Sequence, residues 1–480
     1  MVFNSLHFFA FFALVWTGVL LLRTRIAARN LLLLAASYYF YGWWDWRFLG
    51  LLIFSTVVDY ICGRLMGAKA PDAERGRRDR IILALSMVVS LGLLGFFKYY
   101  GFFVDSAVAA LTRLGFQAHL SSLKIILPVG ISFYTFQTMS YTIDVYRGHV
   151  PPARSLLNFA LFVAFFPQLV AGPIERATAL LPQFSRPTII TWPGLSSGTY
   201  LICSGLFKKV VLADNAATVV QWMFSQNNPN GWEVILGAYA FTLQVYCDFS
   251  GYSDIARGTA RWMGFELMKN FNQPYLATNP ADFWARWHIS LSTWLRDYLF
   301  IPLGGTRKGP LRSYVNIMIV LVLAGLWHGA AWTYVVWGSF HGIILCAHRA
   351  IRPWLEKYLN PQQPFARRAW HVCRVLIFFH IAAVGPLLFR SQNLQHVGEM
   401  FAGFGRWPVR ELLKNTNSLA IVAGGLLVLL AVQLAKELSN DAYILLRLPI
   451  PARAILYAAG ILVFLAFGDF YGEPFIYFQF

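Results

Sequence analysis

Charged residues are scarce in this chain. They make up 13% of its 480 residues, whereas a soluble domain carries about 25%. Apolar runs of helix length, with little alternation, occupy most of the sequence, which excludes a soluble domain and a strand-built barrel. The runs lie at about 6–22, 30–42, 49–66, 81–97, 123–143, 156–172, 195–213, 233–247, 313–326, 331–348, 372–389, 418–435 and 453–471. The sequence therefore predicts an all-α polytopic membrane protein with about 11–13 transmembrane helices.

Cysteine is sparse, and the familiar hydrolase, nucleotide and metal motifs are missing. The chain contains no GxSxG, Walker A or HExxH motif and no metal-ligand cluster. The number of cysteines is odd, no CxxC spacing occurs, and all lie in or beside apolar runs, so we interpret them as small buried residues. They are Cys62, Cys203, Cys247, Cys346 and Cys373. We therefore predict no disulfide, no metal site and no permanently bound cofactor.

Acidic residues are outnumbered by basic ones, which gives a formal net charge of +18. The basic residues gather in short segments between apolar runs, the pattern that the positive-inside rule produces in cytoplasmic loops. We expect such loops at 23–29, 64–80 and 349–371, and no nucleic-acid partner. The first apolar run has no basic segment before it, so we interpret it as a retained span rather than a signal peptide.

The middle of the chain differs from its two ends. There the apolar runs are short and interrupted by glycine, proline and charge. Broken backbone at membrane depth is tolerated only where protein or a water-filled cavity covers it, and charges at that depth usually have a function. We predict a single membrane domain over 1–480, with spans at 1–150 and 372–480 and a catalytic core at 160–345.

A histidine lies between two apolar halves in "LVLAGLWHGAAWTYVVWGSFHG" (321–342). Small neighbours of His328, such as Gly325 and Gly329, allow another helix or a substrate to approach closely. A buried imidazole without a charged partner stays neutral and is a competent general base. The alternative is a histidine that only joins helices. His341 is a weaker candidate in the same stretch.

A second histidine lies in "DFWARWHISLSTWLRDYLFIPLGG" (282–305). The pattern predicts one helix that begins at an Asp282 N-cap and has Arg286 and Arg296 on other faces. Its apolar face would carry Trp284, Trp287, His288 and Leu291. Such a helix lies in the membrane interface, or it is re-entrant and brings His288 towards His328.

Two further stretches place charge in apolar surroundings. In "QVYCDFSGYSDIARG", Asp248 and Asp254 flank Gly251, where we expect a bend. We expect these acids to pair with Arg257, Arg286 or Arg296, with acid–base work or cation binding as alternatives. In "GLFKKVVLADN", the side chains of Lys208 and Lys209 either reach the lipid headgroups or meet an anionic group such as a phosphate.

Six segments, in this order, resemble the bacterial membrane-bound O-acyltransferase family, in its branch of alginate O-acetyltransferases and related polysaccharide acetylation proteins. They are "FPQLVAGPIER", "GLFKKVVLADN", "QVYCDFSGYSDIARGTARWMGFEL", "NFNQPYLATNPADFWARWHISLSTWLRDYLFIPLGG", "GLWHGAAWTYVVWGSFHG" and "FIYFQF". The resemblance implies a ring of membrane helices, some broken or re-entrant, around a central funnel. It also implies that His328 is the essential catalytic residue, and that His288 occupies a second characteristic position that holds Asn or His.

The resemblance further implies that an acyl group passes from a cytoplasmic thioester, acetyl-coenzyme A, to the outer side of the bacterial inner membrane. We expect the acceptor to be an alginate-like polysaccharide or an extracytoplasmic acetyl-carrier protein. The candidate substrate-binding residues are Trp284, Trp287, Arg286, Asp254, Trp327, Lys208 and Lys209, and the donor phosphates are expected near Lys208, Lys209 or Arg307. Alternatives are D-alanyl transfer to teichoic acid, a polysaccharide exporter and a non-catalytic scaffold.

Overall fold

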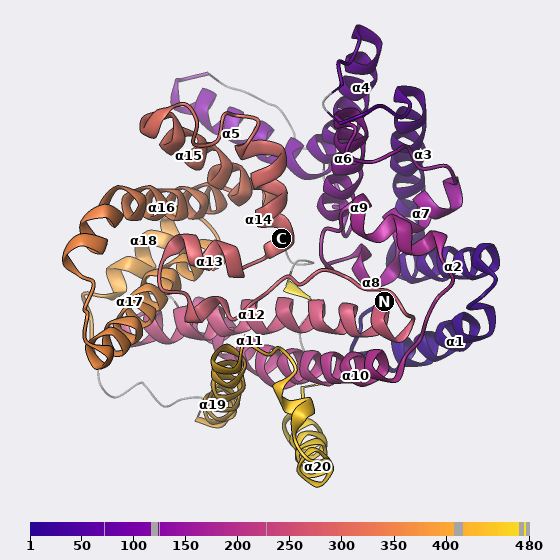
Figure 1. Cartoon of the computed structure of the whole chain (residues 1–480). Coiled ribbons are helices and arrows are strands. Elements are labelled where there is room, and N and C mark those ends of the chain that lie inside the picture. The colour runs from indigo at the N-terminus through magenta and orange to yellow at the C-terminus, as the bar shows by residue number, and fades with distance from the viewer. Residues whose placement is uncertain are drawn as a thin grey trace. The chain divides into compact units, whose positions relative to one another are not determined.

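The computed structural model describes residues 1–71, 73–116, 123, 125–226, 228–407, 416–469 and 475–476. These residues form helices and no strands, which confirms the predicted all-α fold (Figure 1). The chain divides into two compact units. Unit 1 comprises 1–199 and 255–268, and unit 2 comprises 200–254 and 269–480. The predicted core at 160–345 therefore contributes to both units.

Unit 1 is built from the N-terminal helices, in which α6 packs against α3 and α4. Nearly every residue of α6 is buried, including its serines and threonines. The elements are α1 (Leu6–Leu22), α2 (Ile26–Asp45), η1 (Trp46–Phe48), α3 (Leu49–Met66), α4 (Arg77–Leu94), η2 (Gly95–Tyr99), α5 (Tyr100–Arg113), α6 (Ile131–Arg147), α7 (Leu156–Ala164), α8 (Phe166–Leu169), α9 (Ala177–Leu180) and η3 (Leu181–Ser185). Two longer helices, α10 (Trp192–Leu206) and α12 (Gly231–Trp262), pass from one unit into the other.

Unit 2 contains both candidate histidines. Its further elements are η4 (Phe207–Ala213), α11 (Asp214–Phe224), η5 (Pro274–Leu276), α13 (Pro280–Arg286), α14 (Ile289–Leu295), η6 (Arg296–Phe300), α15 (Gly309–His328), α16 (Trp332–Tyr358), α17 (Pro364–Arg390), α18 (Leu394–Gly403), α19 (Thr416–Ser439), η8 (Ile444–Arg447) and α20 (Ile450–Phe467). The elements η4 and η6 are π-helical turns, as is η2 of unit 1. Such turns are rare and frequent at functional sites.

Five segments among the described residues are long and apolar enough to cross a membrane: 26–66, 77–113, 309–328, 364–390 and 450–467. They confirm a polytopic membrane protein, while the count of 11–13 spans and the central funnel remain predictions. The expected loop at 23–29 is shorter in the structure, because α2 begins at Ile26. Arg29 is fully buried in that helix, where it donates hydrogen bonds to Asn30 and to the carbonyl oxygen of Phe184.

The helices α15 and α16 form a closely packed hairpin, side by side in Figure 1. A Cβ added to Gly325 would lie 2.1 Å from the carbonyl oxygen of Tyr334, and one added to Gly338 would lie 2.3 Å from that of Leu321. Glycine is therefore required at both positions, as in other close helix crossings in membranes. The small residues around His328 serve this approach between helices.

The predicted bend at Gly251 is wrong. Helix α12 runs unbroken from Gly231 to Trp262. Gly251 instead lets a neighbouring backbone come close, because an added Cβ would lie 2.8 Å from the carbonyl oxygen of Gly205. Asp248 and Asp254 consequently project from one continuous helix.

Candidate active site

His288 lies in a break between two short helices. Helix α13 ends at Arg286 and α14 begins at Ile289, so the expected single helix is wrong. His288 has φ 40° and ψ 56°, in the left-handed region. A non-glycine residue in this region costs about 1–3 kcal/mol, and such residues cluster at active sites. The surrounding structure must therefore hold this turn in place.

Asn270 supplies much of that support; it begins the segment "NFNQPYLATNPADFWARWHISLSTWLRDYLFIPLGG" but was not among the predicted site residues. Its carbonyl oxygen accepts the N–H of Ile289 at 2.9 Å, and its side-chain oxygen accepts that of Ser290 at 3.4 Å. Its amide nitrogen donates to the hydroxyl of Ser253 on α12 at 3.1 Å. Asn270 thus satisfies the first N–H groups of α14, which a helix start leaves without internal partners, and joins the turn to α12.

The ring of His288 is enclosed by aromatic side chains and is 1% exposed. It meets Phe249 of α12 edge to face at 4.6 Å between ring centroids, and Trp327 at 5.8 Å. Burial lowers the pKa of His288 to about 3, because desolvation disfavours the charged imidazolium. The imidazole is consequently neutral at pH 7, with one nitrogen able to donate and the other to accept a hydrogen bond.

His328 is the last residue of α15 and is 4% exposed. Its ring contacts Trp327 at 5.1 Å, Trp337 of α16 at 5.1 Å and Phe389 of α17 at 5.4 Å. Trp327 therefore touches both candidate histidines. The structure brings together three residues that the sequence proposed as site residues, His288, Trp327 and His328.

His341 belongs to the same cluster of rings. It contacts Trp337 at 4.7 Å and Trp284 at 5.4 Å. Helix α17 approaches so closely that a Cβ on Gly385 would lie 2.9 Å from Nε2 of His341. Trp337 contacts both His328 and His341. His341 therefore belongs to the candidate site, although the sequence made it the weaker candidate.

A cavity of about 1360 Å³ lies among α13, α14, α15, α16 and α17, all in unit 2. Typical ligand pockets measure about 300–1,000 Å³, so this one has room for a large ligand. Its basic lining residues are Arg296, Arg349, Arg352, Arg367, Arg374, His348 and His371. Glu356 is the acidic residue among the described lining residues, and it pairs with Arg352 at 2.7 Å. The cavity therefore favours an anionic ligand.

Basic side chains are concentrated towards one end of this cavity, where apolar residues such as Leu355 and Trp370 also line it. Helices α16 and α17 pack against each other and are joined at residues 359–363. Most of the basic lining residues lie near that corner, whereas Leu321, Phe378 and Ile381 line the cavity farther from it. Beyond them along the same two helices come His341, Gly385 and Trp337. Arg352 and Trp337 are separated by roughly 22 Å of helix, which suits a long ligand with a charged head.

Trp284 lies between the cavity and the histidine cluster. Its side chain lines the cavity, and its ring contacts His341 at 5.4 Å and Trp337 at 6.1 Å. Its indole N–H has no hydrogen-bond acceptor among the described residues. Trp287 instead is buried and stacks on Phe283 at 5.5 Å. Trp284 is thus placed to meet a ligand, whereas Trp287 supports the packing of α13.

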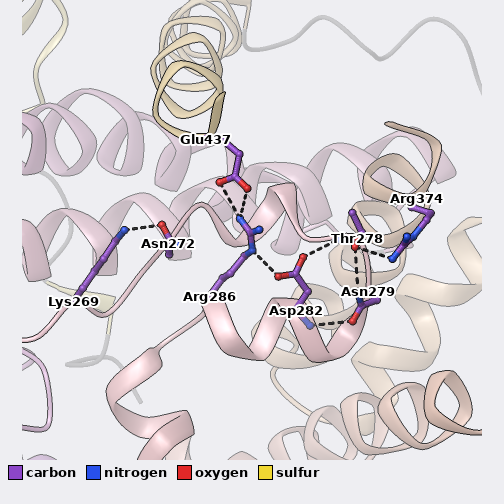
Figure 2. Close-up of polar contacts among 8 residues, drawn as sticks. All are labelled: Lys269, Asn272, Thr278, Asn279, Asp282, Arg286, Arg374 and Glu437. Carbon is purple, nitrogen blue, oxygen red and sulfur yellow. Dashed lines mark hydrogen bonds and ion pairs between the residues drawn. The ribbon is translucent and has the colours of Figure 1, made fainter. Parts of the chain in front are cut away.

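The start of α13 is capped by Asn279 rather than by Asp282, which corrects the expected N-cap. The side chain of Asn279 accepts the N–H of Asp282 at 3.0 Å, and Asp282 in return accepts the N–H of Thr278 at 3.1 Å. Asn279 is thus the N-cap of α13, and Asp282 ties the residue before the cap to the first turn. Figure 2 shows both bonds, together with the bond from Arg374 of α17 to the Thr278 hydroxyl. Helix α13 is therefore fastened to α17 beside the cavity.

Arg286 fastens the other end of α13. Its Nε donates to Asp282 at 2.7 Å, and its Nη1 pairs with Glu437 of α19 at 2.9 Å (Figure 2). Beside it, Lys269 pairs with Asn272 at 2.6 Å. Arg286 does not line the described cavity. Its contacts fix the helix that leads into the His288 turn.

The two lysines of "GLFKKVVLADN" pair with carboxylates within unit 2, and neither lines the described cavity. Lys208 pairs with Asp254 at 2.6 Å, and Lys209 pairs with Asp214 at 2.7 Å and with Asp248 at 2.8 Å. All five groups are largely buried, where a charge needs a partner. Asp248 and Asp254 thus pair with lysines, and of the expected arginine partners Arg286 pairs instead with Asp282 and Glu437. Arg296, for its part, pairs with its neighbour Asp297 at 2.8 Å.

Comparison with known proteins decides the family. The sequence profile of the membrane-bound O-acyltransferase family matches residues 149–388, which include both histidines and the cavity. The chain belongs to this family. Within the described residues, no group of three or more His, Cys, Asp or Glu side chains could hold a metal ion.

Several relatives are similar over most of the chain. It is 43% identical to a probable alginate O-acetylase of Pseudomonas syringae, over 86% of this chain and 77% of that protein. It is 34% identical to a peptidoglycan O-acetyltransferase of Helicobacter pylori, over 84% and 79%. A teichoic acid D-alanyltransferase of Bacillus subtilis is 27% identical over 58% and 73%. The chain is therefore a membrane O-acetyltransferase, a multi-pass protein of the bacterial inner membrane.

Proposed function

We propose that the protein transfers an acetyl group from cytoplasmic acetyl-coenzyme A to a hydroxyl group on the outer side of the membrane. The acceptor is an alginate-like polysaccharide or an extracytoplasmic protein that carries the acetyl group to one. The observation that carries the proposal is the basic cavity, whose lining includes Trp284, a residue in ring contact with His341 of the histidine cluster. Neither His288 nor His328 lines the described cavity itself.

The donor would lie along the cavity with its phosphates at the basic end. Arg349, Arg352 and Arg367 offer fork-shaped donors for phosphate oxygens, which form strong charge-assisted hydrogen bonds. The apolar part of the lining then receives the arm that bears the thioester. This assignment replaces Lys208, Lys209 and Arg307 as the expected phosphate partners, because none of these residues lines the described cavity.

The hairpin of α15 and α16 supports this direction of transfer. Its open end carries Arg307 and Lys308 before α15, Arg312 in the first turn of α15, and Arg352 and Lys357 on α16. Its closed end carries His328. Basic residues beside spans favour the cytoplasm. The 20 residues of α15 extend about 30 Å, which matches the hydrocarbon thickness of a bilayer. A donor that enters at the basic end would thus deliver its acyl group far from the cytoplasm.

The chemistry assigns different tasks to the two histidines. His328 accepts the proton of the acceptor hydroxyl while its oxygen attacks the thioester carbonyl carbon. The carbon–sulfur bond breaks, and the thiolate takes the proton back from the imidazolium, so free coenzyme A leaves. His288, neutral through burial, donates a hydrogen bond that orients the acceptor or stabilises the carbonyl oxygen.

The donor site is tested by two double variants with equal change of charge. Arg349→Gln with Arg367→Gln removes two lining residues, whereas Lys357→Gln with Arg368→Gln removes two basic residues of the same region outside the described lining. With purified protein, acetyl-coenzyme A and an alginate oligosaccharide, we expect the first pair to raise KM for the donor roughly tenfold or more. The second pair should leave it within about twofold, the change that screened surface charges produce.

Equal effects of the two double variants would remove the cavity from donor binding. If the wild-type protein releases no coenzyme A in the presence of acceptor, the proposed donor is wrong. Transfer of a D-alanyl group instead, from a carrier thioester to teichoic acid, would favour the activity named for the Bacillus subtilis relative.

A further inference from the structure

Residues Phe475 and Ile476 form a buried segment that the proposed chemistry does not use. Each is 2% exposed, and both belong to unit 2. They begin the terminal "FIYFQF" stretch, one of the six segments on which the family resemblance rests. They contact helix α12 at two neighbouring residues, Asp248 and Phe249.

The backbone of this segment is held by a charged group. The N–H of Ile476 donates to Oδ2 of Asp248 at 2.7 Å. The other oxygen of Asp248 pairs with Lys209, which also pairs with Asp214. A single lysine thus serves two buried carboxylates. The N–H of Ile476 supplies the second partner that a buried carboxylate requires.

The side chain of this segment reaches the histidine site through one intermediate ring. Phe475 contacts Tyr252 at 4.6 Å and Phe249 at 5.8 Å between centroids. Phe249 in turn meets His288 edge to face at 4.6 Å and 87°. Asp248 and Phe249 are adjacent on α12. Asp248 accepts the backbone N–H of Ile476, and Phe249 contacts the imidazole of His288.

Two further hydrogen bonds join the same part of the chain to η4 and to the start of α11. The N–H of Asp469 donates to the carbonyl oxygen of Val210 at 3.1 Å, and Asn215 donates to that of Phe467 at 2.9 Å. The π-helical turn that carries Lys209 is therefore bonded to the chain before Phe475 as well as to the carboxylate that holds Ile476. Displacement of this turn would act on both attachments.

We propose that Phe475 is a positioning residue for His288, acting through Phe249. The set formed by Lys209, Asp248, Phe249, Phe475 and Ile476 is called the Phe475 clasp. The clasp holds the ring of Phe249 in contact with the imidazole of His288, whose backbone lies in the left-handed region. This contact fixes the direction of the imidazole nitrogens. The proposal rests on the proposed function of His288, but the position of the ring can be measured without turnover.

The first test uses the chemical accessibility of the histidines and needs no activity. Purified protein in detergent is treated with diethyl pyrocarbonate, and modified residues are identified by mass spectrometry. His288 should stay unmodified in the wild type and become modified in Phe475→Ala, while His149, with its side chain 47% exposed, reacts in both. The matched control is Phe467→Ala, since Phe467 is 47% exposed and lies earlier in the same part of the chain. Its replacement should leave His288 protected.

The second test separates positioning from general loss of structure. We expect Phe475→Ala to lower kcat roughly three- to tenfold, the range of an aromatic pair, with KM for acetyl-coenzyme A unchanged. The leucine of Phe475→Leu fills most of the space of the phenylalanine ring, so this variant should keep more of kcat than Phe475→Ala. It replaces Phe475→Ala in the test if that variant does not fold. The double variant Phe475→Leu with Phe249→Leu should lower kcat by less than the product of the two single fold-decreases. The reason is that both substitutions act on the packing of the same ring against His288.

The proposal is overturned if His288 stays protected in both Phe475 variants, if kcat is unchanged, or if the two substitutions act independently. A proportional change in KM would also overturn it, since the donor cavity would then be disturbed instead. Absence of acetyl transfer by the wild type would count against the proposed function alone, because the modification experiment still decides whether Phe475 holds His288.

Discussion

The two histidines of the site are held in place by different means. His328 ends a 20-residue apolar helix, and its surroundings come largely from the hairpin in which it lies. His288 occupies a strained turn between two seven-residue helices. That turn is supported by Asn270, by Phe249 of α12 and, through Phe249, by Phe475, residues that lie far apart in the sequence.

This difference fits the roles proposed for the two histidines, with His328 as general base and His288 as hydrogen-bond donor. A general base must stay at one distance from the reacting hydroxyl, and a rigid helix end in a close-packed hairpin provides this. A hydrogen-bond donor for the acceptor or the carbonyl must point in one direction. The strained turn sets that direction, and the rings packed against the imidazole keep it.

Replacement of His328 is expected to have the largest effect. His328→Ala removes the proposed general base, and general base catalysis contributes about 10²–10⁴-fold. We expect acetyl transfer to fall by that factor while insertion and folding stay normal, as checked by size-exclusion chromatography and by donor binding. Near-normal turnover would exclude His328 from the chemistry and leave its ring as packing material for the hairpin.

The loss of activity on replacing His288 should depend on which side chain replaces it. His288→Ala loses the hydrogen bond to the developing charge, which costs about 2.7–4 kcal/mol, a fall of about a hundredfold or more. His288→Asn should keep a measurable part of the activity, because Asn retains a donor and an acceptor and also tolerates the left-handed backbone. Initial rates of both variants at saturating donor measure the difference.

The Asn variant also distinguishes the two roles. Its pH–rate profile should keep the limb that belongs to His328, since Asn does not titrate in this range. If Asn is as inactive as Ala while both variants bind donor and remain folded, His288 itself transfers a proton and the roles of the histidines must be exchanged.

The smallest effect concerns stability at acid pH. Burial lowers the pKa of His288 to about 3, below the unfolded value of about 6.5. Between these pH values the unfolded chain binds a proton that the folded protein excludes, so His288 lowers stability as the pH falls below about 6.5 and has no such effect above it. His288→Asn should therefore gain stability relative to wild type by up to about 1.4 kcal/mol for each pH unit in this window.

Thermal unfolding in detergent at pH 7.5, 5.5 and 4.5 measures this gain. The control is His149→Asn, because the side chain of His149 is 47% exposed and is not desolvated like that of His288. A stability difference between His288→Asn and wild type that is the same at every pH would show that the imidazole of His288 is protonated as readily in the folded as in the unfolded protein.

Much of the site could be predicted from composition and local pattern. Apolar runs identified the membrane protein, and an isolated histidine among small residues identified the end of α15. The prediction failed where partners come from distant parts of the chain. A helical pattern continues through His288, yet Asn270 supplies the hydrogen bonds that let the chain break there. The spacing of Asp248 and Asp254 likewise gave no indication that their partners would be Lys208 and Lys209.

The sequence by itself determined the class of the protein, because burying so much apolar surface in lipid requires helices that satisfy their own backbone groups. It also determined the glycines that let α15 and α16 meet. The tertiary structure alone decided which charges pair, where the cavity lies and how His288 is turned. These depend on free energies of contacts between residues far apart in the sequence, and a buried charge or a strained turn is stable only when such contacts form.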